Sequence, residues 1–222
     1  MALVRSGAVS SVLPWLLIVV GSYLLGSIPF GYLAGRLCGV DIRTKGSGNI
    51  GATNALRVLG KKWGYAVFLL DFLKGLAPVI VADQWGTYAG VFPASAPGAL
   101  AGLCALLGHS FPVWLGFKGG KGIASSAGVM VALFPAAFLI CLGVWILVFT
   151  TSRYVSVASI AGAIALPLAV LFLYLTHRSD WLALMVSVVM CLLAVWRHRS
   201  NIARLRAGTE PRFEKKSGGV SK

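Results

Sequence analysis

The segment 45–57 (KGSGNIGATNALR) holds the densest group of anion-binding residues in the chain. Its glycines, Gly46 among them, let the backbone approach a ligand closely. A glycine-rich turn that leads into a short helix points N–H groups and partial positive charge at an anion. Arg57 can clamp a phosphate with two parallel hydrogen bonds. The hydroxyl and amide side chains that can bind ligand oxygens are Ser47, Asn49, Thr53 and Asn54. The segment predicts a phosphate site.

The same segment fits a dinucleotide-binding pattern, GxGxxG, with an acidic residue, Asp71, twenty positions after the last glycine. That pattern binds a dinucleotide only between a strand and a helix of a βαβ unit. No strand precedes the segment, and Asp71 lies in an apolar stretch, so we reject this interpretation. A plain glycine-rich loop stays open as an alternative, because Gly, Ser and Asn are ordinary loop residues.

A second cationic segment is 116–122 (GFKGGKG). It lacks the spacing of a Walker A loop, but Lys118 and Lys121 among glycines form a flexible cradle suited to phosphate. The glycines that flank Lys121 are Gly119, Gly120 and Gly122. The lysines can instead mark the cytoplasmic side of the membrane. His109, just before this segment, is either a site residue or a structural histidine.

Two further segments complete a set of four. Segment 197–202 (RHRSNI) places His198 and Asn201 directly after the last apolar stretch, and segment 153–159 supplies hydroxyls that include Ser159. The sequence has no HExxH motif, no acidic metal cluster and no GxSxG elbow. We therefore expect no metal and no cofactor.

The elements that position these segments are apolar helices. Of the 222 residues, 58% are hydrophobic and 12% are charged, whereas a soluble domain carries about 25% charged residues. Apolar stretches cover 12–35, 63–82, 97–116, 154–175 and 180–196, and 124–152 is also apolar. Such lengths suit membrane-spanning helices, and they lack the alternation of barrel strands. The predicted class is an all-α integral membrane protein.

The net charge of +14 comes from 20 Lys and Arg against 6 Asp and Glu. The basic residues lie between the apolar stretches, which favours membrane lipid and anionic substrates over nucleic acid as partners. Counting 124–152 as one crossing puts the basic C-terminal segment outside the cell, against the positive-inside rule. If Pro135 breaks 124–152 into two short helices that return to the same side, the conflict disappears. This predicts seven helical segments, with the N-terminus outside and the C-terminus cytoplasmic.

We expect one domain over residues 1–222, of which 209–222 form a flexible cytoplasmic tail. Inside the second span, Asp71 and Lys74 stand three residues apart on one helix face. Charges within a membrane indicate function by default, but these two can neutralise each other. A structural pair and a pair of site residues both stay open.

The motifs together resemble those of the bacterial acyl-phosphate:glycerol-3-phosphate acyltransferases of the PlsY type. The resemblance rests on segments 26–31 (GSIPFG), 46–54 (GSGNIGATN), 116–122 and 198–202, and it extends from residue 26 to residue 213. It implies a seven-helix protein of the bacterial inner membrane with a cytoplasmic active site. The implied reaction transfers a fatty acyl group from acyl phosphate to the sn-1 hydroxyl of glycerol 3-phosphate, giving lysophosphatidic acid and phosphate. No cofactor is implied, and we expect a monomer.

The resemblance also implies roles for individual residues. The residues that match its catalytic positions are Ser47, Arg57, Lys121, His198 and Asn201. The residues that match its substrate-binding positions are Gly46, Asn49, Thr53, Asn54, Gly119, Gly120, Gly122 and Ser159. The family's third motif commonly reads HREN, and here Ser200 replaces the glutamate, which puts the local bracing of the site in question.

The proton acceptor stays open between His198 and the substrate's own phosphate. Two functions rival the acyltransferase interpretation. One is a carrier of anions or phospholipids, and the other is a membrane scaffold. The sequence does not define the preferred acyl length.

Overall fold

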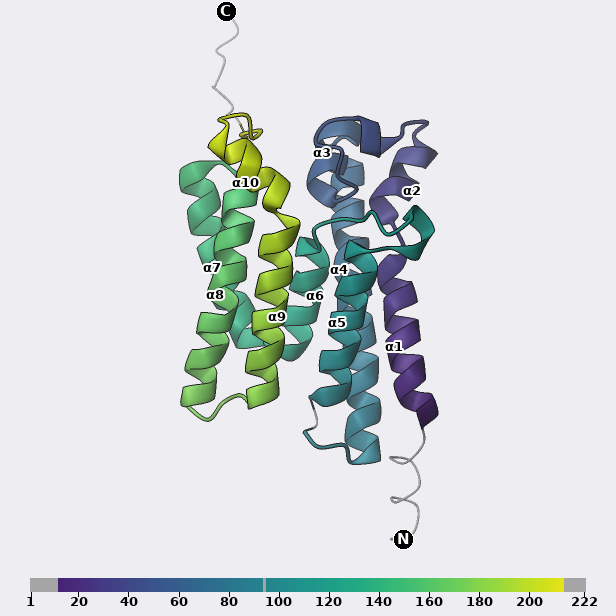
Figure 1. The fold of residues 1–222 in the computed structure, drawn as a ribbon, viewed down its shortest axis with the longest axis vertical. Coiled ribbons are helices and arrows are strands. Elements are labelled where there is room, and N and C mark those ends of the chain that lie inside the picture. The colour runs from purple at the N-terminus through teal and green to yellow at the C-terminus, as the bar shows by residue number, and fades with distance from the viewer. Residues whose placement is uncertain (1–11, 94, 214–222) are drawn as a thin grey trace, which may run out of the picture.

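The computed structural model describes residues 12–93 and 95–213, which contain ten α-helices and no strand. Figure 1 shows them as a bundle of roughly parallel rods. The helices are α1 (Val12–Ser27), α2 (Phe30–Leu37), α3 (Ala52–Leu59), α4 (Lys61–Ala89), α5 (Ala96–Ser110), α6 (Ile123–Leu133), α7 (Pro135–Ser152), α8 (Val155–Leu175), α9 (Trp181–Arg197) and α10 (Arg199–Arg206). Short 3₁₀ turns cover Ile42–Thr44 and Val113–Leu115. The all-α prediction is confirmed.

Five segments are long and apolar enough to cross a membrane: Val12–Leu37, Lys61–Ala89, Ala96–Leu115, Pro135–Ser152 and Val155–Leu175. Helices α9 and α10 meet the same test together but bend by 50° between them. The large exposed side chains along these helices are mostly apolar, as expected where lipid replaces water. The predicted membrane class is confirmed, while the count of seven and the sidedness stay predictions.

The predicted break in 124–152 is present. Helix α6 ends at Leu133 and α7 begins at Pro135, with Phe134 between them. Pro135 has no N–H to continue the helix. The chain reverses at this point, so the start of α6 and the end of α7 face the same end of the bundle, where α10 lies (Figure 1).

Glycines allow the helices of the first half to touch. A Cβ at Gly26 of α1 would overlap the backbone oxygen of Ala105 in α5, and Gly108 of α5 lies as close to α1. Gly75 of α4 and Gly128 of α6 make the same kind of approach between those two helices. Small residues at both faces are the usual means by which membrane helices pack without a hydrophobic driving force. Helices α1, α4, α5 and α6 therefore form one tightly packed group.

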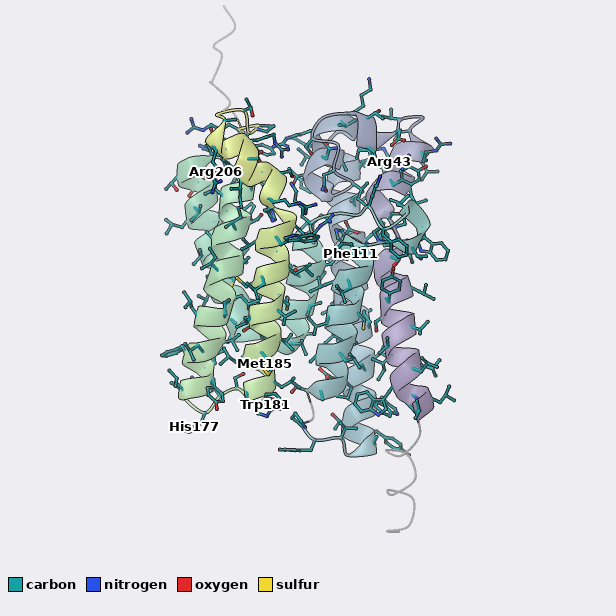
Figure 2. The ribbon with its side chains drawn as sticks, in the orientation of Figure 1. Arg43, Phe111, His177, Trp181, Met185 and Arg206 are labelled. Carbon is teal, nitrogen blue, oxygen red and sulfur yellow. The ribbon has the colours of Figure 1, made fainter. Side chains whose placement is uncertain are left out.

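Basic side chains gather at one end of the bundle. Figure 2 shows Arg43 and Arg206 at the end of α3 and α10, with His177 and Trp181 at the opposite end. In the described ranges, Arg178 is the one Lys or Arg at that opposite end. The basic residues from which the topology was predicted thus lie mainly at one end of the bundle. Residues 1–11 and 214–222, which include the predicted N-terminus and part of the predicted tail, lie outside the described residues.

Gly26 provides a test of this packing. We expect Gly26→Ala to lower the free energy of unfolding by about 1–3 kcal/mol, the usual cost of overpacking. Gly21→Ala, on the same helix, is the control, because a Cβ there meets nothing within 4 Å and alanine favours the helix. Thermal unfolding of the purified protein in detergent measures both. Equal melting temperatures for the two variants would contradict the close contact.

Candidate active site

A cavity of about 840 Å³ lies between α3, α4 and α6 on one side and α7, α8 and α9 on the other. Ten of the predicted site residues line it: Ser47, Asn49, Thr53, Asn54, Arg57, Lys121, Gly122, Ser159, His198 and Asn201. The remaining three, Gly46, Gly119 and Gly120, do not line it. The four motif segments therefore surround one cavity.

Asn54 holds the glycine-rich turn together. Its buried side-chain amide donates to the carbonyl oxygens of Ile42 (3.1 Å), Lys45 (3.1 Å) and Asn49 (2.8 Å). Its Oδ1 accepts a hydrogen bond of 2.8 Å from the backbone N–H of Ser47. Gly46 sits beside this amide with φ +59, where a side chain would be strained and would meet Asn54. These bonds indicate that Asn54 shapes the turn.

Helix α3 carries Thr53 and Arg57 on one face, one turn apart, and both line the cavity. Spacing of four residues places side chains on the same side of a helix. The Arg57 guanidinium lies at the rim, 5.0 Å from the centre of the Phe213 ring, and Nη2 donates to the Pro211 carbonyl at 3.4 Å. Burial lowers the pKa of Arg57, which still leaves it charged at neutral pH.

Arg197 holds the glycine loop before α6. Its Nε donates to the carbonyl of Gly120 (2.9 Å) and its Nη2 to the carbonyl of Gly119 (2.7 Å). The Gly120 N–H donates to the carbonyl of His109 at 3.1 Å, and the His109 ring fills the space that a Cβ at residue 120 would need. Arg197 thus engages both glycine carbonyls, and neither glycine lines the cavity. Sequence analysis assigned these glycines to binding and gave Arg197 no role.

Lys121 enters the cavity from this loop beside the N-terminus of α6. Gly122 precedes the helix with φ +79 and makes no side-chain cap, and Ile123 and Ala124 of the first turn also line the cavity. A helix start with free N–H groups favours an anion. Burial lowers the pKa of Lys121 to about 8, and the nearby guanidinium groups act in the same direction. An anion bound here neutralises that repulsion.

His198 and Asn201 face the cavity from the junction of α9 and α10. His198 is 2% exposed, and its Nδ1 lies 2.8 Å from the Ala194 carbonyl. Because that carbonyl can only accept, Nδ1 carries the proton and Nε2 is the free acceptor. Opposite, the Ser159 hydroxyl accepts a hydrogen bond of 3.3 Å from the Trp145 indole. His198 therefore presents an unprotonated nitrogen.

Glu210 is a cavity residue that sequence analysis missed. Its carboxylate accepts hydrogen bonds from Asn201 Nδ2 (2.6 Å) and Arg204 Nε (2.8 Å). Burial opposes its ionisation, but the neighbouring Ser156, Asn201 and Arg204 together outweigh burial and lower its pKa. Ser200, where the family commonly has glutamate, is exposed. The chain has only six Asp and Glu residues. Because they are so few, each of them, Glu210 included, could have been considered as a site residue.

A buried charged cluster lies beneath the cavity. Lys74 Nζ lies 2.8 Å from Asp71 Oδ1 and donates to the Ile28 carbonyl at 2.7 Å. His109 Nδ1 lies 3.6 Å from the same carboxylate oxygen. The predicted neutralising pair is present, and it holds α4 against the break between α1 and α2. Asp71 and His109 also line the cavity, so the cluster belongs to the wall of the site.

The rest of the cavity is apolar. Its inner wall includes the buried side chains of Met130, Leu166 and Met190. Its outer wall includes Tyr65 and Phe68, which are 65% and 47% exposed on the surface of α4. The cavity thus joins a cationic rim to an apolar groove that reaches the lipid-facing surface.

The pKa of Lys121 generates a test with inorganic phosphate as the probe. As the pH rises through about 8, Lys121 loses its charge, so phosphate affinity should fall, by about tenfold between pH 7.5 and 9.5. Lys121→Arg stays protonated and should remove this fall. Lys118→Arg, in the same loop but exposed, is the matched control and should keep it. Equal pH profiles of the phosphate Kd for the protein and Lys121→Arg would contradict this role.

Known proteins share this arrangement over nearly the whole chain. The family model described as "Glycerol-3-phosphate acyltransferase" matches residues 16–208. Glycerol-3-phosphate acyltransferases of Geobacter metallireducens and Synechococcus sp. (strain CC9902) are 52% and 48% identical to this chain. These alignments cover 90% of this chain in both cases, and 97% and 96% of the relatives.

A solved structure matches as well. The crystal structure of PlsY (YgiH), an integral membrane glycerol 3-phosphate acyltransferase, in its glycerol 3-phosphate form, superposes with a TM-score of 0.80 at 44% identity. The match covers 90% of this chain and 95% of that one. A lysophosphatidic acid form of PlsY gives a TM-score of 0.77. This chain belongs to the glycerol-3-phosphate acyltransferase family of PlsY-type integral membrane proteins.

Proposed function

We propose that this protein transfers a fatty acyl group from acyl phosphate to the sn-1 hydroxyl of glycerol 3-phosphate, giving lysophosphatidic acid and phosphate. The observation that carries the proposal is the single cavity in which a cationic rim meets an apolar groove. Both substrates carry a phosphate, and the donor also carries a fatty chain. The glycerol 3-phosphate and lysophosphatidic acid forms of the related PlsY structure support this substrate and product.

The rim supplies groups for two phosphates. Arg57 with Ser47 and Thr53 forms one cationic and hydroxyl-bearing wall, and Lys121 with the start of α6 forms another. We assign the reacting centre and donor phosphate to the 46–57 segment, and the phosphate of glycerol 3-phosphate to the 119–122 loop. His198, Asn201 and Ser159 complete the site. Holding two anions together against their repulsion is the main task of such a site.

The reaction needs no covalent enzyme intermediate, because acyl phosphate is already activated. The sn-1 hydroxyl oxygen bonds to the acyl carbonyl carbon, and the bond from that carbon to the phosphate oxygen breaks. The phosphate leaves with the bonding electrons, stabilised by the cationic groups of the rim. The hydroxyl proton passes either to the donor phosphate, which we favour, or to Nε2 of His198. A His198→Gln variant with near-normal kcat would contradict the histidine alternative.

The basic end of the bundle supports a cytoplasmic active site. Lys and Arg of short loops collect in the cytoplasm, and nearly all of those in the described ranges lie at the end that holds the cavity rim. We propose seven membrane segments, with α6 and α7 as the short pair, in the bacterial inner membrane. One chain supplies every residue around the cavity, so we propose that a monomer suffices.

The first test combines the purified protein with acyl phosphate and glycerol 3-phosphate. Phosphate release should require both substrates and should equal the lysophosphatidic acid formed. A carrier with the same cationic cavity would bind phosphate and form no product. Absence of lysophosphatidic acid with donors of every chain length would therefore exclude the proposed reaction.

Arg57 provides the second test. We expect Arg57→Ala to lower kcat/KM by about 10²–10³, because it removes a charge that stabilises the leaving phosphate. Arg206→Ala is the matched control, since Arg206 is an exposed arginine of the same basic end that does not line the cavity. Steady-state assays of both variants measure the difference. A scaffold function predicts, on the contrary, that Arg57→Ala has no effect.

A further inference from the structure

The segment after α10, residues 209–213, lines the cavity through Glu210 and Phe213, and we call it the strap. It is held to α10 by Glu210, whose side chain is 6% exposed and pairs with Arg204 at 2.8 Å. At its other end it is held to the turn between α7 and α8. There the Phe213 N–H donates to the Arg153 carbonyl (3.0 Å) and Arg212 Nε donates to the Ser152 carbonyl (3.1 Å). The strap is thus tied at both ends.

Phe213 lies between Arg57 of α3 and the aromatic side chains near the end of α7. Its ring lies 5.8 Å from the Phe149 ring in an edge-to-face arrangement, and Phe149 stacks on Trp145 at 5.0 Å. On the other side, the Arg57 guanidinium lies 5.0 Å from the Phe213 ring. All four side chains line the cavity. The strap therefore adds an aromatic wall where the cavity meets the water at the basic end.

This placement matters because acyl phosphate reacts with any nucleophile that reaches it. A water molecule can bond through its oxygen to the acyl carbonyl carbon as the bond to the phosphate oxygen breaks. Phosphate then leaves with the bonding electrons, and the proton released from the water passes to that phosphate or to the solvent. The products are a fatty acid and phosphate. An open cavity would waste the donor in this way, and exclusion of water is a common means of preventing such side reactions.

We propose that Phe213 determines the choice of acceptor, by excluding water from the donor so that glycerol 3-phosphate receives the acyl group. The inference rests on the proposed function, since it requires acyl phosphate as the donor. It assigns a role to a segment that lies beyond the family match, which ends at residue 208. Phe213 acts by closing the site and takes no part in proton transfer.

The test measures phosphate, lysophosphatidic acid and free fatty acid after incubation with acyl phosphate and glycerol 3-phosphate. The protein as it stands should give phosphate and lysophosphatidic acid in nearly equal amounts. Phe213→Ala should raise the ratio of fatty acid to lysophosphatidic acid by at least about threefold, because loss of the ring lets water reach the donor. A threefold change in relative rate needs only a small change in activation barrier. Arg212→Ala, which frees one end of the strap, should raise the ratio in the same direction. Phe213→Tyr should restore the low ratio.

Phe92→Ala is the matched control, because Phe92 is a 96% exposed phenylalanine near the far end of α4. Its product ratio should equal that of the unchanged protein. If Phe213→Ala and Arg212→Ala still form lysophosphatidic acid with no rise in the ratio, the inference is wrong and the proposed function stands. If the unchanged protein forms no lysophosphatidic acid from any acyl phosphate, the donor assignment fails, and the inference fails with it.

Discussion

The reversal of the chain at Phe134 decides at which end of the bundle the basic segments after α7 lie. An apolar stretch that crossed the membrane completely between residues 124 and 152 would place α10 and the 119–122 loop at opposite ends. Because α6 stops short and α7 returns, both come to the end that holds α3. The close approach of α6 to α4 through Gly75 and Gly128 keeps the short helix buried in protein. Broken helices are tolerated at membrane depth under that condition.

The rim of the cavity carries an excess of positive charge, which favours the binding of anions. Lys121 loses part of its basicity to burial and to neighbouring guanidinium groups, and Arg57 rests against an aromatic ring and a carbonyl. The one carboxylate at the rim, Glu210, is engaged by Asn201 and Arg204. Under the proposed function, each phosphate that binds relieves repulsion among these cations, and the remaining positive charge offsets the repulsion between the two anions.

Much of this arrangement could be predicted from the sequence. Positive charge in short loops and the proline at residue 135 were enough to predict the broken pair, and glycine with hydroxyl and amide residues indicated the segments that meet around the cavity. The orientation of the Gly119 and Gly120 carbonyls was not predictable, because it depends on Arg197, nearly eighty residues away. The same holds for residues 209–213, predicted as part of a flexible tail, whose contacts reach the α7–α8 turn and α3. Helix α4 extends to Ala89, beyond the apolar stretch at 63–82. Long-range contacts accompany this extension: Asp83 accepts a hydrogen bond from the Gly98 N–H, and Trp85 packs on Trp15.

Two exposed aromatic residues of α4, Tyr65 and Phe68, give the cavity a wall toward the lipid, in addition to its cationic rim. Under the proposed reaction, the two products then leave into different phases. Lysophosphatidic acid can move sideways into the bilayer with its chain never crossing water, while phosphate departs through the basic end. The energy of the anhydride bond gives the reaction its direction, while the architecture of the cavity gives each product its own way out.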